Sequence, residues 1–395
     1  MSTNIQKNQI TEGIIWRQLL LFFFPILLGT FFQQLYNTID SVIVGQFVGK
    51  EALAAVGGSS AQIVAFVVGF FTGLSSGASV TIAQFFGAKD SRSANKGLHT
   101  AYAIAAFGGL ILTVSGIILT PFLLEMMNTP ADIVADSAVY LRIYFAGIIF
   151  VLIYNMGSAI LRATGDSKRP LYYLIVCCII NIVLDVLFVI VFHMGVMGVA
   201  VATLIAQAVS AVLVTLKLMR SEGILKLSVK QIRFHGSILK MQLKLGLPTG
   251  FEAILFSITN IAIQSAVNTF GTDTTAAWSA YGKLDAIFWM VSTAFGIAIT
   301  TFVGQNYGAG KMDRVRKSTR VCLLMDFIVS AVLVVFLIAA RFLLFRLFTN
   351  DSHVIEIGCD MLVLITPWYI VYVFIEVIAG ALRGVGNVVV PVVIT

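Results

Sequence analysis

The chain has 395 residues, of which 58% are hydrophobic and only 11% are charged, and its formal net charge is +7. A soluble globular domain carries about 25% charged residues, so this composition excludes an ordinary soluble protein. The mean hydropathy of +0.96 indicates an integral membrane protein. Lys and Arg lie mainly between the apolar runs, as in cytoplasmic loops. We therefore attribute the positive charge to membrane topology and expect no nucleic-acid partner.

Charge-poor windows long enough to cross about 30 Å of hydrocarbon recur along the chain. Because lipid offers no hydrogen bonds to an open strand, these windows predict helices and an all-α membrane protein. The predicted spans are 15–47, 52–86, 97–124, 137–161, 170–192, 195–216, 245–269, 275–306, 321–348 and 357–382, and an eleventh begins near 388. The windows at 52–86 and 275–306 exceed one crossing. Each is predicted as one long helix, because dividing either would invert the charge pattern of the following loops.

The loops predict how the chain is oriented. Basic loops such as "GAKDSRSANKG" and "GAGKMDRVRKSTR" alternate with loops nearly free of Lys and Arg. The positive-inside rule then places the N-terminus in the cytoplasm of a multi-pass protein of the plasma (inner) membrane. Residues 217–244 are predicted to be a basic cytoplasmic linker. The four cysteines lie in or beside apolar runs and form no disulfide framework.

An internal repeat divides the chain. "TIAQFFGAKD" (81–90) resembles "TFVGQNYGAG" (301–310), and "LRATGDSKRP" resembles "LRGVGNVVVP" at an offset of 221 residues. Six spans bring the chain back to the same side, so the sequence predicts a parallel repeat of two six-helix lobes, an architecture typical of secondary transporters. The amino lobe is expected at 1–216 and the carboxyl lobe at 245–395. About 10 to 11 of 12 spans are present, so we expect the second lobe to be truncated.

Two isolated acids lie within spans. Asp40 falls in the outer half of the first span and Asp185 in the outer half of the fifth, so they could meet at one level. Asn181 lies one turn before Asp185, and Thr203 is also in an outer half. A charge in a span is costly and marks a functional hypothesis. Such an oxygen-rich site can share a proton between coupled acids or coordinate a hard cation such as Na⁺. The alternative is that these acids only bond neighbouring helices or face interfacial water.

An ordered set of motifs resembles one transporter family. The set comprises "NTIDSVIVG", "GAKD", "LRATGDSKRP", "NIVLDVLF", "GVMGVAVATLIAQ" and "TFVGQNYGAG". It is similar to the multidrug and toxic compound extrusion (MATE) family, in which two six-helix lobes enclose a cavity and organic cations leave the cell in exchange for H⁺ or Na⁺. The resemblance implies an amino-lobe cation site of Asp40, Asn181, Asp185 and Thr203, with Asn155 as an addition. It also implies that Pro25 bends the first helix. A static kink is the alternative.

The carboxyl lobe departs from the family pattern. Some members hold Na⁺ there with a glutamate in the seventh span and an aspartate in the tenth, whereas this chain has Glu252 about a turn early and Tyr372 at the aspartate position. Four charged residues in apolar runs are expected either to form ion pairs or to contact substrate: Glu252, Lys283, Asp285 and Glu376. The other candidates to line the cavity are Gln34, Tyr36, Phe288, Trp289 and Met290.

The sequence therefore predicts a cation-coupled antiporter that exports organic cations by alternating access, and not an enzyme. H⁺ or Na⁺ is the expected coupling ion, with no cofactor. Partners are small organic cations and the lipid bilayer, and the chain is expected to be a monomer. A lipid-linked oligosaccharide flippase of related architecture is the alternative, although its pyrophosphate substrate would call for Arg and Lys in the cavity. A prenyl transferase would need an Asp-rich Mg²⁺ motif, which the sequence lacks.

Overall fold

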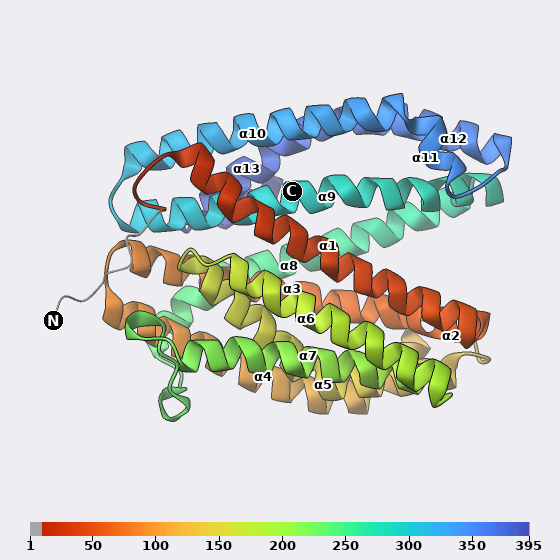
Figure 1. The fold of residues 1–395 in the computed structure, drawn as a ribbon, viewed down its shortest axis with the longest axis horizontal. Helices are drawn as coiled ribbons and strands as arrows, with labels where there is room; N and C mark the ends of the chain where they lie inside the picture. The colour runs from red at the N-terminus through yellow and green to blue at the C-terminus, as the bar shows by residue number, and fades with distance from the viewer. Residues whose placement is uncertain (1–9, 395) are drawn as a thin grey trace.

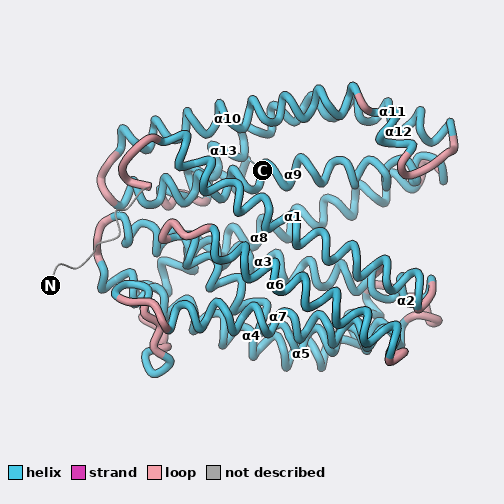
Figure 2. The backbone as a smooth tube through the Cα atoms, in the orientation of Figure 1, coloured by secondary structure: helices cyan, strands magenta, loops and turns pink. Residues whose placement is uncertain are grey.

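The structure is a computed structural model that describes residues 10–394, and the regular structure in that range is helical, as predicted (Figures 1 and 2). Ten helical segments are long and apolar enough to cross a membrane. The α-helices are α1 (Ile15–Phe47), α2 (Lys50–Gly57), α3 (Ser59–Gly87), α4 (Ser91–Met126), α5 (Val134–Ala163), α6 (Lys168–Asp185), α7 (Gly195–Met219), α8 (Gly236–Asn268), α9 (Thr272–Gly308), α10 (Met312–Ala339), α11 (Arg341–Arg346), α12 (Ser352–Ile365), α13 (Tyr369–Val385) and α14 (Val389–Ile394).

The helix bounds agree with most predicted spans and differ at four places. The span predicted at 321–348 is interrupted at Ala340, between α10 and the short α11. A break at Gly58 separates the short α2 from α3, yet the two together form one spanning segment, as the charge pattern requires. The span predicted at 357–382 is divided by a 3-10 turn at Thr366–Trp368, where Pro367 cannot donate a helical hydrogen bond. Helix α8 begins at Gly236, within the predicted linker 217–244. Lys240 and Lys244 therefore lie inside α8. Their long side chains can still reach the aqueous interface, because both residues are near the start of the helix.

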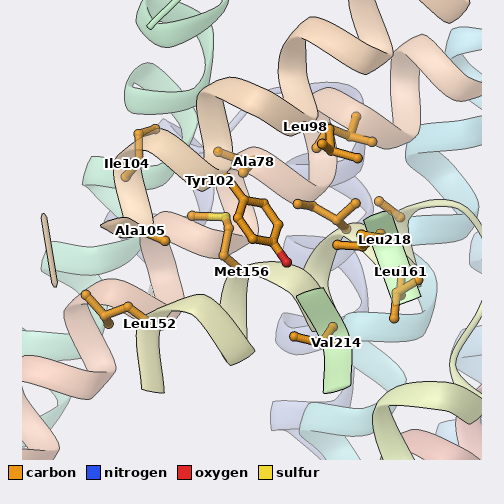
Figure 3. Close-up of a cluster of buried hydrophobic side chains, with 14 of the residues drawn as sticks. Ala78, Leu98, Tyr102, Ile104, Ala105, Leu152, Met156, Leu161, Val214 and Leu218 are labelled. Atoms are coloured by element: carbon orange, nitrogen blue, oxygen red, sulfur yellow. The ribbon is translucent and has the colours of Figure 1, made fainter. Parts of the chain in front are cut away.

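The amino-terminal half, α1 to α7, has its largest apolar core between α3, α4, α5 and α7. Figure 3 shows Tyr102 of α4 at the centre of this core, beside Met156 of α5 and Val214 of α7. The Tyr102 hydroxyl lies 3.4 Å from Thr215 Oγ1, which gives the buried phenol a polar partner. This core fixes α5 and α7 as a rigid support on which α6 and the outer part of α1 can pack.

The two halves approach closely where α3 crosses α8. Gly73 and Gly77 of α3 face Gly250 and Gly246 of α8, so each helix contributes two glycines four residues apart. A Cβ atom on any of the four would overlap the opposite helix, and the overlap is with backbone atoms. This is the small-residue spacing that lets membrane helices pack with their backbones in contact.

The repeated glutamine and glycine motifs form a reciprocal contact that we call the glutamine latch: Gln84, Gly87, Gln305 and Gly308. Gln84 Nε2 donates to the carbonyl of Gly384 at 2.9 Å, and Gln305 Nε2 donates to the carbonyl of Ala163 at 2.7 Å. Gly87 packs against the backbone of Gln305, and Gly308 packs against that of Gln84. Every partner is related to its counterpart by the 221-residue offset. The internal repeat therefore places equivalent groups on both sides of one interface.

Helix α1 connects the two halves, and Figure 1 shows it passing from beside α10 at one end to α2 at the other. Its first part packs on α9, with the rings of Phe23 and Phe295 stacked at 4.0 Å between centroids. Beyond Pro25 the helix packs on α6, where Gly29 lies against Leu174. Side-chain hydrogen bonds join residues before 217 to residues after 244 at the end with the basic loops. These bonds hold the two halves together at that end.

The glycine crossing predicts a strong position effect. Gly77→Val places a branched side chain against the α8 backbone, so we expect it to destabilise the protein by about 1–3 kcal/mol or more. Gly282→Val is the matched control, because nothing lies within 4 Å of a Cβ there. Thermal unfolding in detergent compares the two variants. Equal thermal midpoints would contradict the proposed crossing.

Candidate cation-binding site

Three helices bring the predicted acids to one depth. Asp40 lies seven residues before the C-terminal end of α1, and Thr203 lies eight residues after the N-terminal end of α7. Because these two helix ends lie on the same side of the protein, both residues are about 10–12 Å from that side. Asp185 is the last α-helical residue of α6, before a π-helical segment at Val186–Val191. Such π-helical turns occur often at functional sites. The sequence-based prediction that Asp40 and Asp185 share a level agrees with this placement.

The four side chains face one another in the protein interior. Asp185 is 0% exposed, Asn181 1%, Thr203 7% and Asp40 9%. Thr203 Oγ1 donates to Asp40 Oδ2 over 3.5 Å, and the Asp40 carboxyl group lies near the side chains of Asp185 and Asn181. We call these four residues the acidic pair site.

The site contains buried polar atoms that have no hydrogen-bond partner: Asp40 Oδ1, both carboxyl oxygens of Asp185, and both Asn181 side-chain polar atoms. Each unsatisfied group costs about 1–3 kcal/mol, and a buried charge costs more. Two adjacent carboxylates cannot both ionise without a further penalty. The donor set is hard and rich in oxygen, so it fits a shared proton or a hard cation such as Na⁺. Among residues 10–394, no group of three or more His, Cys, Asp or Glu side chains is arranged to hold a metal ion.

Polar aromatic residues border the acidic pair site. Tyr36 is buried, receives a hydrogen bond of 3.2 Å from Gln207 Nε2, and lies near Asp40, Tyr140 and Tyr144. Sequence reasoning named Tyr36 and missed Gln207, Tyr140 and Tyr144. Gln207 follows Thr203 by four residues, and Tyr144 follows Tyr140 by four, so helical periodicity was the available signal.

The remaining amino-half candidates lie apart from this cluster. Asn155 is half-buried on α5 and Gln34 is exposed on α1, and neither has a described contact with Asp40 or Asp185. Pro25 is buried within the uninterrupted helix α1.

In the carboxyl-terminal half, α8 to α14, an arginine that sequence reasoning missed joins two predicted acids. Arg383 of α13 lies 2.6 Å from Glu252 of α8 and 3.5 Å from Glu376 of α13, and the three side chains are 13% exposed. Tyr372 donates to Glu376 at 3.3 Å. This triad holds two acids and one cation. Its sequence signal was the repeat, because Arg383 corresponds to Arg162.

The other predicted charges have different surroundings. Asp285 accepts hydrogen bonds from Tyr369 and from Trp289 Nε1, and Tyr369 is bonded to Tyr281. Lys283 is exposed on α9, and the ion pairs formed by described residues do not include it. Of the two roles expected for Lys283, the ion pair is not formed, because two residues separate Lys283 from Asp285 by about 200° around the helix. The substrate contact stays a prediction.

Among the aromatic and methionine candidates in this half, Phe288 is fully buried and stacks on Tyr369 at 4.0 Å between centroids. It therefore belongs to the core and does not line a cavity. Trp289 and Met290 are half-buried, and the Trp289 ring packs edge-on against Tyr372. Asp326 of α10 was not predicted. It is fully buried, accepts a hydrogen bond of 3.1 Å from Ser330, and lies near Glu376.

Comparison with known proteins identifies the family. The MatE family model matches residues 25–187 and again 248–395, so the repeat is present in the family match itself. The chain therefore belongs to the MATE family, whose members are transporters and not enzymes. It is a multi-pass membrane protein.

Two relatives from Bacillus subtilis (strain 168) are similar over much of the chain. "Probable multidrug resistance protein YoeA" is 31% identical over 389 residues, covering 96% of this chain and 84% of the relative. "Probable multidrug resistance protein YpnP" is 32% identical over 312 residues, covering 79% and 69%. A solved structure described as the outward-facing conformation of a MATE family transporter superposes with a TM-score of 0.91 at 22% identity, covering 99% of this chain and 87% of that one. This last likeness concerns the fold.

The unsatisfied carboxyl oxygens predict that removing one of the two acids stabilises the protein. Asp185→Asn removes one of two competing acids, so we expect a higher thermal midpoint at pH 8 than that of the unmodified protein. Asp132→Asn, in an exposed loop at the same end of the molecule, is the control and should leave the midpoint unchanged. A lower midpoint for Asp185→Asn would mean that the ionised carboxylate is already well satisfied.

The triad predicts an unequal pair of arginine effects. Arg383→Met leaves Glu252 and Glu376 buried without their cation, so we expect a loss of about 3–5 kcal/mol in the free energy of unfolding. Arg162→Met is the matched control at the equivalent repeat position. There Asn155 corresponds to Glu376 at the offset of 221 residues, and Gly29 corresponds to Glu252 at the offset of 223 residues that aligns Pro25 with Pro248. Equal losses in the two variants would show that the triad contributes no specific stabilisation.

Proposed function

We propose that this chain is a multidrug exporter that moves small organic cations out of the cell in exchange for H⁺ or Na⁺ bound at the acidic pair site. The observation that carries the proposal is the buried Asp40 and Asp185 pair, which presents oxygens without hydrogen-bond partners. The two Bacillus relatives, both named as probable multidrug resistance proteins, support the export of drugs.

The charge balance of the buried groups favours a cationic substrate. The acidic pair site has two acids and no base, and the triad has two acids against Arg383. Tyr36 and the neighbouring tyrosines add aromatic faces that attract organic cations. A flippase for pyrophosphate-linked lipids would instead need Arg or Lys free to bind phosphate, and the charge of Arg383 is already matched by two glutamates.

The path of α1 suggests how the site could drive movement. Before Pro25 the helix is held on α9 by Phe22 and Phe23, and beyond it the helix carries Asp40 to α6 and α7. Pro25 removes one backbone hydrogen bond at this transition, which makes it the natural bending point. When a cation or proton neutralises Asp40 and Asp185, the outer part of α1 can repack without moving the part held on α9.

We take the amino lobe 1–216 and the carboxyl lobe 245–395 as the moving bodies, joined by the linker. The positive-inside rule places the basic loops, the glutamine latch and the N-terminus on the cytoplasmic side of the plasma membrane. The described state is then closed to the cytoplasm, and inward opening requires the latch to separate. The coupling ion and the substrate drive the cycle through different affinities for the two states. One chain carries both lobes, so a monomer suffices.

Uptake of ethidium into inverted vesicles tests this function. We expect accumulation driven by an imposed H⁺ or Na⁺ gradient, loss of accumulation in Asp40→Asn, and normal accumulation in the control Asp132→Asn. Whichever gradient drives uptake identifies the coupling ion. Folded protein that transports no cation under either gradient would contradict the proposal and favour the flippase. Undiminished uptake by Asp40→Asn would remove that residue from the coupling site.

The bending role of Pro25 gives a separate prediction. Pro25→Ala restores a backbone donor in the middle of α1, so we expect greater thermal stability together with transport slowed by about tenfold or more. Binding of the substrate to the purified protein should change little, because Pro25 lies about 22 Å along the helix from Asp40. Normal transport rates with a stabilised α1 would show that the proline is only a static kink.

A further inference from the structure

The segment between α7 and α8 is folded onto the start of α4. Asn95 Nδ2 donates to the carbonyls of Ile224 and Lys226, at 3.0 and 3.1 Å. The backbone N–H of Ser228 donates to His99 Nε2 at 3.0 Å, and His99 Nδ1 bonds to the carbonyl of Asn95 at 2.8 Å. Because a carbonyl only accepts, His99 carries its proton on Nδ1 and is neutral. This linker is therefore fixed in place by specific bonds.

The fold of the linker creates a pocket of about 330 Å³. Its lining includes four cationic side chains, Arg92, Lys96, Lys230 and Arg233, and two histidines, His99 and His235; no Asp or Glu lines it. His235 uses both ring nitrogens, with Arg233 Nε donating to Nε2 at 3.3 Å and Thr100 Oγ1 at 3.1 Å from Nδ1. Burial, together with the neighbouring Arg233, Lys96 and His99, lowers the pKa of His235. The pocket is a region of concentrated positive potential.

The surroundings of this pocket favour a lipid as the source of its ligand. It lies where α4 and α8 begin, which is the level of the polar headgroups for two spanning helices. From Gly236 onward, one open face of α8 presents Leu239, Leu243 and Leu247 together with Lys240 and Lys244. Exposed apolar rings of Phe107 and Phe234 pack edge to face nearby, at 5.9 Å between centroids. Acyl chains would pack against this apolar face of α8 and the two rings, and an anionic headgroup would bind the basic side chains of the pocket.

We propose that the pocket formed by Arg92, Lys96, Lys230, Arg233 and the two histidines binds a phosphate-bearing anion, for which the adjoining apolar face of α8 and the exposed rings of Phe107 and Phe234 indicate an anionic phospholipid of the cytoplasmic leaflet. Binding would hold the linker against α4 and so secure the connection between the two lobes. This site is separate from the acidic pair site. It does not depend on which substrate or coupling ion the transporter uses.

Native mass spectrometry of the whole purified chain tests the proposal with phosphatidylglycerol and, as the uncharged comparison, phosphatidylcholine of the same acyl chains. The test variant is Lys96→Gln with Lys230→Gln, because no side-chain hydrogen bond that holds the linker comes from either lysine. The control is Arg316→Gln with Lys317→Gln, which removes two exposed charges at the start of α10. A parallel thermal-shift titration with inorganic phosphate separates a headgroup from a free anion.

We expect the unmodified protein and the control to retain one phosphatidylglycerol in preference to phosphatidylcholine, and the test variant to bind it about 10- to 30-fold more weakly. Stabilisation by inorganic phosphate alone, lost in the same variant, would keep the phosphate site and assign it to a soluble ligand. Equal retention of phosphatidylglycerol by the test variant and the control, without a phosphate effect, would overturn the proposal. If the double variant unfolds, Arg92→Gln provides the same comparison with one exposed charge removed.

Discussion

A carboxylate inside a membrane protein must be neutralised by a proton, a cation or a set of donors, and Asp40 and Asp185 have too few donors for two charges. The rest of the architecture holds these acids in that position. The core of α3, α4, α5 and α7 fixes the supporting helices, and α1, whose first part packs on α9 of the carboxyl half, carries Asp40 to them. Because the site is incompletely satisfied by the protein alone, its occupancy can bias the packing of α1. That is the property a coupling site requires.

The two halves share a fold and differ in their chemistry. In the carboxyl half, Arg383 is matched by Glu252 and Glu376. The equivalent Arg162 has Asn155 in place of Glu376 and, when Pro25 is aligned with Pro248, Gly29 in place of Glu252. The amino half places its acids elsewhere, at Asp40 and Asp185. The repeat therefore supplies the symmetric glutamine latch, and substitutions within it supply the functional asymmetry. One half contains a buried acidic site whose oxygens lack partners, and the other contains a triad in which Arg383 pairs with both acids.

The sequence predicted much about how deep each residue lies along the membrane normal, and little about which helices pack side by side within the membrane plane. Hydropathy and loop charge determine the spans and their direction, and residue counting then gives depth, which is why Asp40, Asp185 and Thr203 were assigned to one level. Lateral packing depends on which helix faces touch. Arg383 therefore went unrecognised, Lys283 was considered for an ion pair that it does not form, and Phe288 was considered for a cavity although it lies in the core. The folded linker was hidden for the same reason, because its bonds to Asn95 and His99 join segments about 130 residues apart.

The most direct test of the central claim is equilibrium binding of a fluorescent organic cation to the purified protein, measured as a function of pH and of Na⁺ concentration. If the acidic pair site exchanges its ion for substrate, the dissociation constant of the unmodified protein rises as pH falls or as Na⁺ increases. That dependence disappears in Asp40→Asn and persists in Asp132→Asn. An Asp40→Asn protein that binds the cation with the same dependence on both ions would contradict the account.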